Sequence, residues 1–573
     1  MEIKDNMKKE IEEIIKSALT NLGLSQDVVF TVEHPEDIKH GDYSSNVALI
    51  YSKEVGKNPR DLGQQIKDEI EKEKFLNIAK IEIAGAGFIN FYLTKEFFTQ
   101  KINQILEEGN NWGKNKILEG KKVMIEYTDP NPFKPFHIGH LMANAVGESI
   151  SRIIEYSGAD TIRANYQGDL GLHVAKAIYG LKEYGLPEES KSVSDKAIYI
   201  GQCYSKASNL YDDDPRVKNE IDLLNKKIYE QDKEIKDIYD WGRKITLEAF
   251  QAIYKFLDTN FDYYFFESEM VSIGTEIVKD NMEKIFEESN GAIVFDGQKY
   301  DSKLHTRVFI NSQGIPTYEA KEIGLTLTKF EKENLDLSIV TTAIEQAEYM
   351  KVVQKAISLI YPEIEKKMKH ITHGMMKLVS GKMSSRKGNI ITGEALINDS
   401  VSVVLEKIKD RDFKEDDRKD ISEKVGLSAL RYSILKSHLG ADIIYDFDKS
   451  ISFDGDSGPY LQYTAVRANS ILEKSKTFDL AKRKNTRREV SFLEKTLYQF
   501  PEIVEKSYIN LEPHHIVKYL TELAGSFNVF YGQTKILAEE NDCMEYDLKI
   551  VKSFYQTMKN GLYLLGIKIP DKM

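Results

Sequence analysis

Apolar residues in the first 110 positions recur with the spacings of a small α+β unit. Between Lys8 and Leu22, the residues Ile11, Ile15 and Leu19 fall on one face, as in an amphipathic helix. Residues 81–93 are rich in apolar and aromatic residues around two glycines, which predicts a strand pair or a bent strand. The glycine- and asparagine-rich stretch 109–113 then predicts a linker to the next domain.

The pattern that follows predicts a parallel sheet. Residues 123–127 form an apolar strand-like run, which the stretch Asp129-Pro130-Asn131-Pro132 ends. A helix with apolar residues on one face is expected from about Gly139, and residues 161–166 predict a second strand. Strand, helix and strand in this order form a right-handed crossover unit of a parallel sheet.

Farther along, the pattern divides the chain into three domains. Charged residues and helix formers between 181 and 260 indicate an insertion, after which 292–295 and 337–340 resume the strand pattern. From about residue 401 helices dominate, and Gly566 is placed to cap the last one. Helices are expected at Val401–Ile408, Val425–His438, Tyr460–Ser475, Phe492–Tyr508 and His514–Leu537. We therefore expect domains at 1–110, 118–400 and 401–573.

The composition narrows the class of protein without assigning a function. Hydrophobic residues make up 41% and charged residues 30%, an ordinary balance for a globular protein. The net charge of −12 argues mildly against an evenly charged nucleic-acid binder but allows local basic faces. Two cysteines suit a reducing compartment, and neither a signal-peptide pattern nor a membrane-length apolar stretch is found. We expect a cytoplasmic protein with no membrane partner.

A first cluster of functional side chains stands where the predicted strand turns into the predicted helix, at Pro135-Phe136-His137-Ile138-Gly139-His140. A helix N-terminus presents backbone N–H groups and the positive end of a dipole to an anion. His137 and His140 are three residues apart and can face one phosphate chain, while Gly139 allows a nucleotide to approach closely. Taken alone, the motif suits two surface histidines at a helix start better than a nucleotide site.

A second cluster lies about 240 residues later, at Lys382-Met383-Ser384-Ser385-Arg386-Lys387-Gly388. Its three cations and two hydroxyls, flanked by glycines, suit a loop that closes over a triphosphate. Such a loop would stabilise the charge of departing pyrophosphate. Taken alone, the segment also suits a solvated basic loop.

In this order and at this separation, the two clusters resemble the ATP-handling signatures of class I aminoacyl-tRNA synthetases. Further segments narrow the resemblance to arginyl-tRNA synthetases: His40–Asn46, Gly85–Phe91, Glu126–Asn131, Gly458–Tyr463 and Leu565–Met573. The family's second signature has the consensus Lys-Met-Ser-Lys-Ser, so Ser385 stands where a second lysine is expected. Arg386, Lys387 or Lys134 can supply that cation, and arginyl enzymes are similar in carrying a lysine just before the first signature.

The resemblance implies roles for individual residues. The expected catalytic residues are His137, His140, Lys382, Lys134 and Lys387. The expected ATP-binding residues are His137, Gly139, His140, Lys382, Met383, Ser384 and Ser385. The expected arginine-binding residues are Glu126, Asn131, His137, Tyr318, Glu322 and Gln346.

The spacing and chemistry of two of these residues suit an arginine pocket, but they also suit an exposed helix. Tyr318 and Glu322 are one helical turn apart and can face one pocket, although such a pair also occurs on exposed helices. A planar guanidinium favours carboxylates that accept paired hydrogen bonds. The family usually has Asp at the position of Glu322, so the length of this side chain changes the expected geometry.

The residues expected to contact tRNA are Phe88, Asn90, Tyr460, Tyr463, Tyr531 and Met573. The first two would meet the tRNA elbow and the others the anticodon. Aromatic faces suit unstacked bases, although tyrosines in a helix bundle also serve as packing.

The chain is accordingly interpreted as a multidomain α/β protein with a small α+β N-terminal domain. A Rossmann-type catalytic domain with a parallel sheet and an all-α C-terminal bundle would follow. The resemblance implies ligation of L-arginine to its tRNA through an arginyl-adenylate, with Mg²⁺ arriving on ATP and no protein-bound metal. We expect a monomer.

The alternatives are another class I synthetase such as the cysteinyl enzyme, a catalytically silent tRNA-binding paralogue, and a small-molecule nucleotidyl transferase. Against the cysteinyl enzyme stands the lack of cysteine and histidine clusters suited to zinc.

Overall fold

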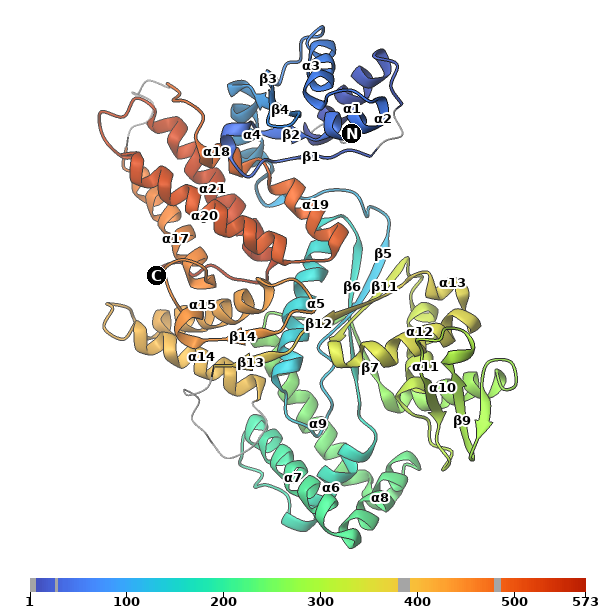
Figure 1. Ribbon diagram of the computed structural model, residues 1–573. Coiled ribbons are helices and arrows are strands. Elements are labelled where there is room, and N and C mark those ends of the chain that lie inside the picture. Colours follow the sequence, from blue (N-terminus) through green and yellow to red (C-terminus); the bar gives the residue numbers. More distant parts are fainter. Residues whose placement is uncertain (1–6, 26–28, 380–391, 479–485) are drawn as a thin grey trace. The chain divides into compact units, whose positions relative to one another are not determined.

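The computed structural model describes residues 7–25, 29–379, 392–478 and 486–573 (Figure 1). Contacts between residues divide the chain into two compact units. The first consists of Met1–Gly113, Arg467–Ile503 and Glu522–Asn560, and the second of Lys114–Val466, Val504–Thr521 and Gly561–Met573. The N-terminal segment therefore forms one compact unit with two stretches of the C-terminal helices.

The N-terminal part of the first unit contains a four-stranded antiparallel sheet in the order β1-β2-β4-β3. The expected amphipathic helix is α1 (Met7–Asn21), whose apolar face is buried. The expected strand pair is β3 (Ile78–Ala84) and β4 (Phe88–Leu93), joined by a turn in which two glycines have positive φ. The other elements are β1 (Val32–Glu33), β2 (Tyr43–Ser45), α2 (Val47–Val55), α3 (Pro59–Ile70), α4 (Lys95–Glu108) and the 3₁₀ turns Ile38–His40 and Gly109–Asn111.

The stretch 109–113, expected as a linker, is part of the packing of the first unit. Trp112 is buried, and Asn560 of α21 (Met544–Leu564) donates hydrogen bonds to the carbonyls of Gly109 (2.9 Å) and Trp112 (3.0 Å). Tyr43 on the N-terminal sheet donates a 2.5 Å hydrogen bond to Glu502. These contacts join segments that are more than 400 residues apart, which no local pattern could indicate.

A five-stranded parallel sheet in the order β12-β11-β5-β6-β7 forms the centre of the second unit (Figure 1). Its strands are β5 (Lys122–Glu126), β6 (Asp160–Gln167), β7 (Tyr263–Phe266), β11 (Leu337–Ala343) and β12 (Met368–His373). The predicted crossover is confirmed, because α5 (Ile138–Tyr156) joins β5 to the adjacent β6. Residues of β5 and α5 are almost all buried, which explains why β5 reads as an unbroken apolar run.

The predicted insertion at 181–260 is helical. It contains α7 (Val193–Asp213), α8 (Pro215–Tyr229) and α9 (Lys233–Phe256), and it is preceded by α6 (Leu172–Tyr184), which begins after Gly171 and ends within the predicted range. The side chains of Ser192, Asp214 and Asp232 accept backbone N–H groups at the starts of α7, α8 and α9. Phe133, from the loop before α5, is fully buried in the core of these helices. The insertion therefore anchors the loop that leads to the first signature.

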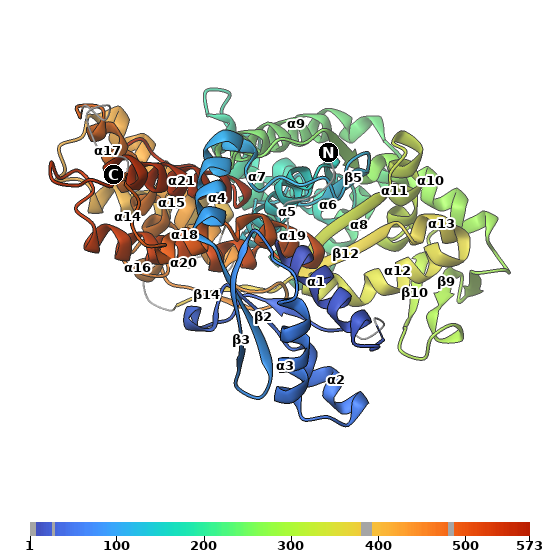
Figure 2. The ribbon, with the colours of Figure 1, turned by 90° about the horizontal axis from the view of Figure 1, so that it is seen from above.

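One predicted strand lies outside the central sheet. The apolar run 292–295 belongs to β9 (Ala292–Asp296), which pairs antiparallel with β8 (Glu287–Ser289) and β10 (Thr306–Ile310). Phe295 packs there among aromatic rings in a separate core. Figures 1 and 2 show this small sheet beside α10 (Glu267–Asp280), α11 (Tyr318–Lys332), α12 (Ala347–Ile360) and α13 (Pro362–Glu365).

The remaining elements are mainly helical, as predicted. They are α14 (Gly393–Lys407), α15 (Glu415–Leu435), α16 (Phe447–Ser450), α17 (Gly458–Ser475), α18 (Phe492–Leu497), α19 (Phe500–Asn510) and α20 (His514–Gln533), besides α21. The helix expected over 492–508 is interrupted just before Pro501, since proline lacks the N–H that a continuous helix needs. A short strand that the pattern did not indicate, β14 (Ile443–Tyr445), pairs with β13 (Met376–Leu378). No helix in the described part of the chain is long and apolar enough to cross a membrane.

Candidate active site

The turn from β5 into α5 brings the two signature histidines together. The rings of His137 and His140 stack with their centroids 3.6 Å apart and their planes inclined by 19°. The Nδ1 atom of His140 accepts a hydrogen bond from the backbone N–H of His137 (3.2 Å). A Cβ atom on Gly139 would lie 3.0 Å from His137 Cε1, so a larger residue would push this ring aside. The three-residue spacing of His137 and His140 therefore places both rings face to face at the start of α5.

Both imidazoles are neutral at physiological pH. Burial, and then the charge of Lys134, lowers the pKa of His137 to about 4. Burial, and then the neighbouring His137, lowers the pKa of His140 well below its usual value. A neutral imidazole offers one N–H donor and one acceptor. Positive charge at this helix start therefore comes from the helix dipole and from Lys134 rather than from the histidines.

The segment between β5 and α5 is held in a strained conformation. Thr128, Asp129 and Phe133 have φ values of 83°, 46° and 67° in the left-handed region, which a β-branched or bulky residue seldom adopts. Hydrogen bonds hold two of these residues: Asn144 Nδ2 donates to Thr128 Oγ1 (3.1 Å), and the Tyr166 amide donates to Asp129 Oδ1 (2.8 Å). Such strain costs about 1–3 kcal/mol per residue and is typical of functional sites.

Three buried carboxyl groups converge beside this segment. Glu126 ends β5, Glu267 begins α10 and Glu322 lies on α11, with exposed fractions of 2%, 4% and 6%. Lys329 forms an ion pair with Glu126, and Lys321 forms one with Glu267. The sequence indicated Glu126 and Glu322. It did not indicate Glu267 or the two lysines, because their proximity depends on how α10 and α11 pack.

Glu322 is the carboxyl group of this cluster without a cation of its own. It forms no ion pair with any described residue, and burial followed by the charge of Glu126 raises its pKa to about 8. Asp129 also faces the cluster, and its pKa is raised well above the usual range by burial and then by Glu126. The cluster is therefore set to accept a cationic ligand.

Unsatisfied polar atoms mark the same edge of the sheet. Asn165 Oδ1, Tyr166 Oη and Gln167 Oε1 at the end of β6, and Thr341 Oγ1 near the end of β11, are buried without a hydrogen-bond partner among the described residues. Buried polar groups are nearly always paired, so such a concentration points to a ligand or ordered water. Open parallel sheets bind ligands at the carboxyl ends of their strands, where these atoms lie.

The other residues expected to bind arginine lie around this edge with different exposure. Asn131 Oδ1 accepts a hydrogen bond from the Gly168 amide (3.1 Å). Tyr318 is the first residue of α11 and is 57% exposed, with the Lys321 ammonium 4.6 Å from its ring centroid. Gln346 is exposed in the 3₁₀ turn Ile344–Gln346, which follows β11. Their contacts with arginine stay predictions.

The residues expected from the second signature, Lys382, Met383, Ser384, Ser385 and Lys387, lie outside the described part of the chain. The residues that follow it return to the first signature. Thr392 forms an antiparallel bridge with His137, and the Gly393 amide donates a 2.8 Å hydrogen bond to the Phe136 carbonyl. Although about 240 residues separate the two motifs, Thr392 and Gly393 therefore lie next to the signature histidines.

Family models and known relatives match the chain over nearly its whole length. The family model described as class I (R) tRNA synthetase catalytic domain matches residues 101–447, the DALR anticodon binding domain matches 461–573, and the arginyl tRNA synthetase N terminal domain matches 9–93. An arginine–tRNA ligase of Clostridium perfringens is 30% identical over 552 residues, covering 95% of this chain and 96% of the relative. One of Fusobacterium nucleatum is 31% identical over 582 residues and covers 99% of both.

The chain belongs to the arginyl-tRNA synthetases. A solved arginyl-tRNA synthetase of Thermus thermophilus shares the fold, with a TM-score of 0.81 at 24% identity over 99% of this chain and all of that one. Arginyl-tRNA synthetases are ligases that join arginine to tRNA at the expense of ATP. Membership in the family sets aside the cysteinyl enzyme and the small-molecule nucleotidyl transferase as alternatives.

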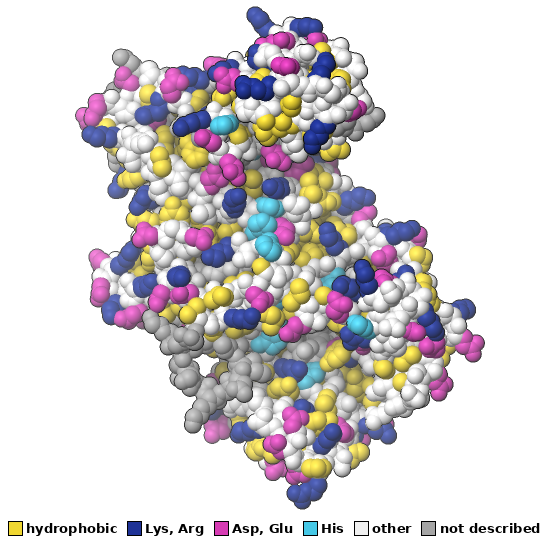
Figure 3. Space-filling view, in the orientation of Figure 1, with side chains coloured by type: hydrophobic (Ala, Val, Ile, Leu, Met, Phe, Trp, Pro, Cys, Tyr) yellow, Lys and Arg dark blue, Asp and Glu magenta, His cyan; other side chains and the backbone are white. Residues whose placement is uncertain are grey.

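As a synthetase, the protein binds tRNA, and the residues expected to contact it differ in accessibility. Phe88 and Tyr531 are 41% and 44% exposed, whereas Asn90 is buried and accepts a 2.7 Å hydrogen bond from Ser44. Tyr460 and Tyr463 are half-buried on α17. Met573 packs against the apolar core between α14 and α15. Basic and acidic side chains are interspersed over the face drawn in Figure 3. Exposure favours Phe88 and Tyr531, but each contact stays a prediction.

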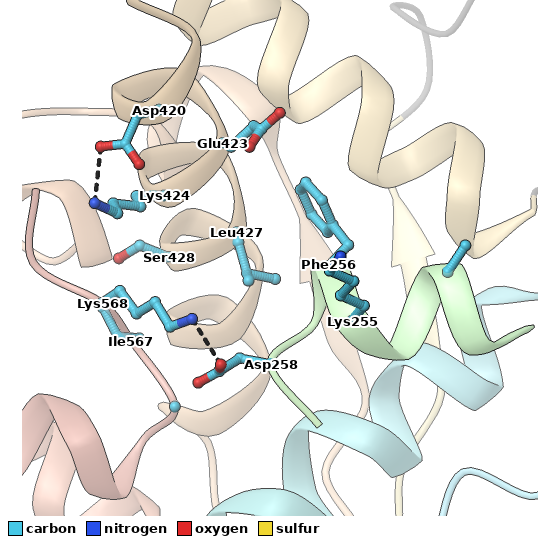
Figure 4. A pocket seen from close by; sticks show the side chains of 12 residues that line it. Lys255, Phe256, Asp258, Asp420, Glu423, Lys424, Leu427, Ser428, Ile567 and Lys568 are labelled. Carbon is cyan, nitrogen blue, oxygen red and sulfur yellow. Dashed lines mark hydrogen bonds and ion pairs between the residues drawn. The ribbon is translucent and has the colours of Figure 1, made fainter. Parts of the chain in front are cut away.

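A pocket of about 410 Å³, drawn in Figure 4, has none of the residues of the candidate site in its lining. The end of α9, one face of α15 and the tail after Gly566 line it. Its charges are largely internally paired, since Lys424 bonds to Asp420 (2.7 Å) and Lys568 to Asp258 (2.6 Å). We assign no role in the chemistry to this pocket.

In the described ranges, no group of three His, Cys, Asp or Glu side chains is arranged to hold a metal ion.

Proposed function

We propose that this synthetase forms arginyl-adenylate and transfers the arginyl group to tRNA at the edge of the central sheet where α5 begins. The main support is the juxtaposition of two chemically distinct subsites. The neutral histidine pair at the start of α5 suits the phosphates of ATP. The carboxyl cluster of Glu126, Glu267 and Glu322, buried next to β5, suits a guanidinium.

The proposed arginine-binding residues are Glu126, Asn131, His137, Tyr318, Glu322 and Gln346. Buried carboxyl groups favour arginine because its guanidinium is planar, permanently charged and able to donate paired hydrogen bonds. An ammonium such as that of lysine carries the same charge but does not match this geometry. The chain carries the longer Glu322 where the family usually has Asp, and it would therefore reach farther into the pocket.

The proposed ATP-binding residues are His137, Gly139, His140, Lys382, Met383, Ser384 and Ser385, with Lys134 and Lys387 as further catalytic cations. The arginine carboxylate oxygen would attack the α-phosphorus, and pyrophosphate would leave with its Mg²⁺. A hydroxyl of the tRNA terminal ribose would then attack the carbonyl carbon, and AMP would leave. No side-chain nucleophile is required, so rate enhancement rests on orientation and on stabilising charge.

The proposed tRNA contacts are Phe88 and Asn90 for the elbow, and Tyr460, Tyr463, Tyr531 and Met573 for the anticodon. We further propose functional domains at 1–110, 118–400 and 401–573 in a monomeric, cytoplasmic enzyme. The spread of the family matches over 9–93, 101–447 and 461–573 supports a division near these positions.

A charging assay tests the proposal. The purified enzyme is supplied with total tRNA, ATP and each of the twenty amino acids in turn. We expect labelled arginine alone to be esterified to tRNA, together with arginine- and tRNA-dependent release of pyrophosphate. Preferential charging of another amino acid, or tRNA binding without any adenylate, would contradict the proposal; the second result would identify a catalytically silent paralogue.

A further inference from the structure

Two lysine side chains lie buried within the carboxyl cluster, where a cation is rarely placed. Lys321 and Lys329, both on α11, are each only 2% exposed. Lys321 pairs with Glu267 at the start of α10, and Lys329 pairs with Glu126 at the end of β5. After the cost of desolvation, a buried ion pair contributes little net stability. Stability alone therefore does not explain why two such pairs occur in one pocket.

Glu322 lies on the same helix next to Lys321 and seven residues before Lys329. Seven residues are close to two helical turns, so Glu322 and Lys329 face the same way. Glu322 is 6% exposed, yet it forms no ion pair with any described residue. The titratable groups that face it are Glu126, Asp129, Tyr166, Glu267, Lys329 and Tyr349. Of these, Lys329 is the cation, and it is already engaged by Glu126.

We propose that Lys321 and Lys329 are positioning residues: they hold Glu267 and Glu126 in closed ion pairs and thereby reserve Glu322 for the substrate guanidinium. The inference rests on the proposed function and deepens it by assigning a role to two residues that contact carboxylates rather than substrate. Without the lysines, three neighbouring carboxyl groups would compete for one cation and repel one another. With both pairs closed, Glu322 is the carboxyl group of these three that has no ion pair among the described residues, so an incoming guanidinium finds an unpaired partner there; the neighbouring Asp129 accepts a hydrogen bond from the Tyr166 amide. The hydroxyl of Tyr166, buried without a partner in the described structure, adjoins the same place.

Binding of arginine should release a proton from Glu322, and this release can be measured. Burial beside Glu126 raises the pKa of Glu322 to about 8, so this group is largely protonated at pH 7. A bound guanidinium stabilises the carboxylate form. The entry of arginine therefore breaks the O–H bond of Glu322 and releases the proton to solvent. Affinity for arginine should rise with pH from 6 to about 8 and then level off.

The first experiment counts these protons. Arginine binding to the whole enzyme is measured by titration calorimetry at pH 7 in two buffers with different ionisation enthalpies. We expect arginine binding to release protons at pH 7 and to release fewer at pH 8.5, in line with a group whose pKa lies near 8. Arginine binding without proton release at pH 7 would overturn the inference while leaving the proposed function intact. A protein that binds arginine no better than lysine would contradict the proposed function itself.

The second experiment tests the lysine directly. In Lys329→Met, Glu126 loses its partner and adds an unpaired charge next to Glu322. We expect about a tenfold or larger rise in the KM for arginine, an unchanged KM for ATP, and a shift of the arginine pH profile to higher pH. Lys329→Arg should keep the arginine KM and the pH profile of the parent. Lys332→Met, at an exposed lysine in the last turn of the same helix, should behave like the parent.

A purely structural role for the pair predicts a different result. Lys329→Met would then lower the turnover or the yield of folded enzyme without moving the pH profile of the arginine KM, and this outcome would overturn the inference. If Lys329→Met does not fold, the comparison of the parent with Lys329→Arg and the proton count of the parent still decide the matter. A Lys329→Arg variant with normal stability but the arginine KM of a disrupted pocket would also contradict it.

Discussion

At the scale of single residues, burial decides which side chains of this site carry charge. His137 and His140 lose their charge because they are desolvated beside Lys134, whereas Glu322 keeps its proton because it is desolvated beside Glu126. The helix start thus offers neutral donors to phosphates, and the pocket offers a carboxyl group that ionises when a cation arrives. Each property follows from position rather than from residue type.

Glu322→Gln should therefore impair arginine binding selectively. The substitution keeps the size of the side chain but removes the charge that a guanidinium requires. Losing a hydrogen bond to a charged group costs about 1.5–3 kcal/mol, so we expect the arginine KM to rise by one to two orders of magnitude. The KM for ATP should stay within twofold. Charging kinetics at pH 8 measure both, with Glu331→Gln at an exposed position of α11 as the control. A parental arginine KM would remove Glu322 from the pocket.

Lys382→Ala should lower turnover more than it weakens ATP binding. A cation that contacts the leaving pyrophosphate acts mainly in the transition state, and its loss should cost about 2–4 kcal/mol of activation, by analogy with an oxyanion-hole donor. Turnover in the charging assay measures this effect. Lys134→Ala, Arg386→Ala and Lys387→Ala, assayed in parallel, identify the cation that takes the place of the lysine missing at Ser385. An unchanged turnover of Lys382→Ala would exclude this loop from the mechanism.

His173 should make the stability of the enzyme depend on pH. Its Nε2 lies 2.8 Å from the Gly168 carbonyl, and burial lowers its pKa to about 3. Because the unfolded chain binds a proton near pH 6.5 and the folded chain does not, stability falls as the pH drops below that value. At pH 5 the loss from this residue is about 2 kcal/mol relative to pH 7. His173→Gln can still donate to Gly168, and its urea midpoint should fall less between pH 7 and pH 5. An equal fall would show that His173 does not titrate on unfolding.

At the scale of elements, two glycines set how closely α10 and α11 approach. A Cβ on Gly274 would lie 2.1 Å from the Ala320 carbonyl oxygen, and one on Gly324 would lie 2.9 Å from the Gly274 nitrogen. This close crossing brings Glu267 of α10 to Lys321 of α11. The helix-to-helix distance is therefore part of the pocket, although neither glycine belongs to it.

Gly274→Ala should damage both packing and arginine binding. Alanine improves helix propensity by about 1 kcal/mol, but overpacking at this crossing should cost about 1–3 kcal/mol, and the helices must separate. We expect a lower thermal midpoint together with a higher arginine KM. Gly525→Ala in α20, where a Cβ would meet open space, provides the matched control and should raise stability slightly. If both variants behave alike, the glycine crossing has no special role.

At the scale of the whole molecule, chemistry and tRNA selection are expected to reside in different parts of the chain. The carboxyl cluster and the signature histidines belong to the unit built on the parallel sheet, and Tyr531 belongs to the other unit. Tyr531 is 44% exposed, stacks beside the buried Phe527 at 6.2 Å between centroids, and has the Arg467 guanidinium 5.5 Å from its ring. Such a ring is available to stack with an unpaired base.

Tyr531→Ala should weaken tRNA binding by about 1–3 kcal/mol if a base stacks on the ring. Adenylate formation at saturating tRNA should remain close to that of the parent. Equilibrium tRNA binding and pyrophosphate exchange measure the two effects, and Val529→Ala, at another exposed position of α20, is the control. A loss of helical signal in Tyr531→Ala would instead show that this tyrosine serves mainly as packing.

The sequence by itself determined the local elements and the chemistry of the signatures. The period of apolar residues predicted α1, the β3–β4 pair, the β5–α5–β6 crossover and most C-terminal helices, because these depend on residues only a few positions apart. The spacing of His137 and His140 predicted that both rings would lie at one helix start, which the 3.6 Å stack confirms. The second signature falls on residues that the structure does not describe, so its arrangement remains a prediction.

Tertiary structure alone decided which distant residues meet. It placed β9 in a separate sheet, packed residues 109–113 against Asn560, and brought Lys321 and Lys329 to Glu267 and Glu126. None of these contacts has a local signal, because a lysine on an amphipathic helix has the same sequence pattern whether it meets solvent or a buried carboxylate. Desolvation is likewise a property of the folded chain, and it sets the pKa values of His137 and Glu322. The sequence therefore supplies the residue types of the pocket, whereas packing in the folded chain determines which of them are charged.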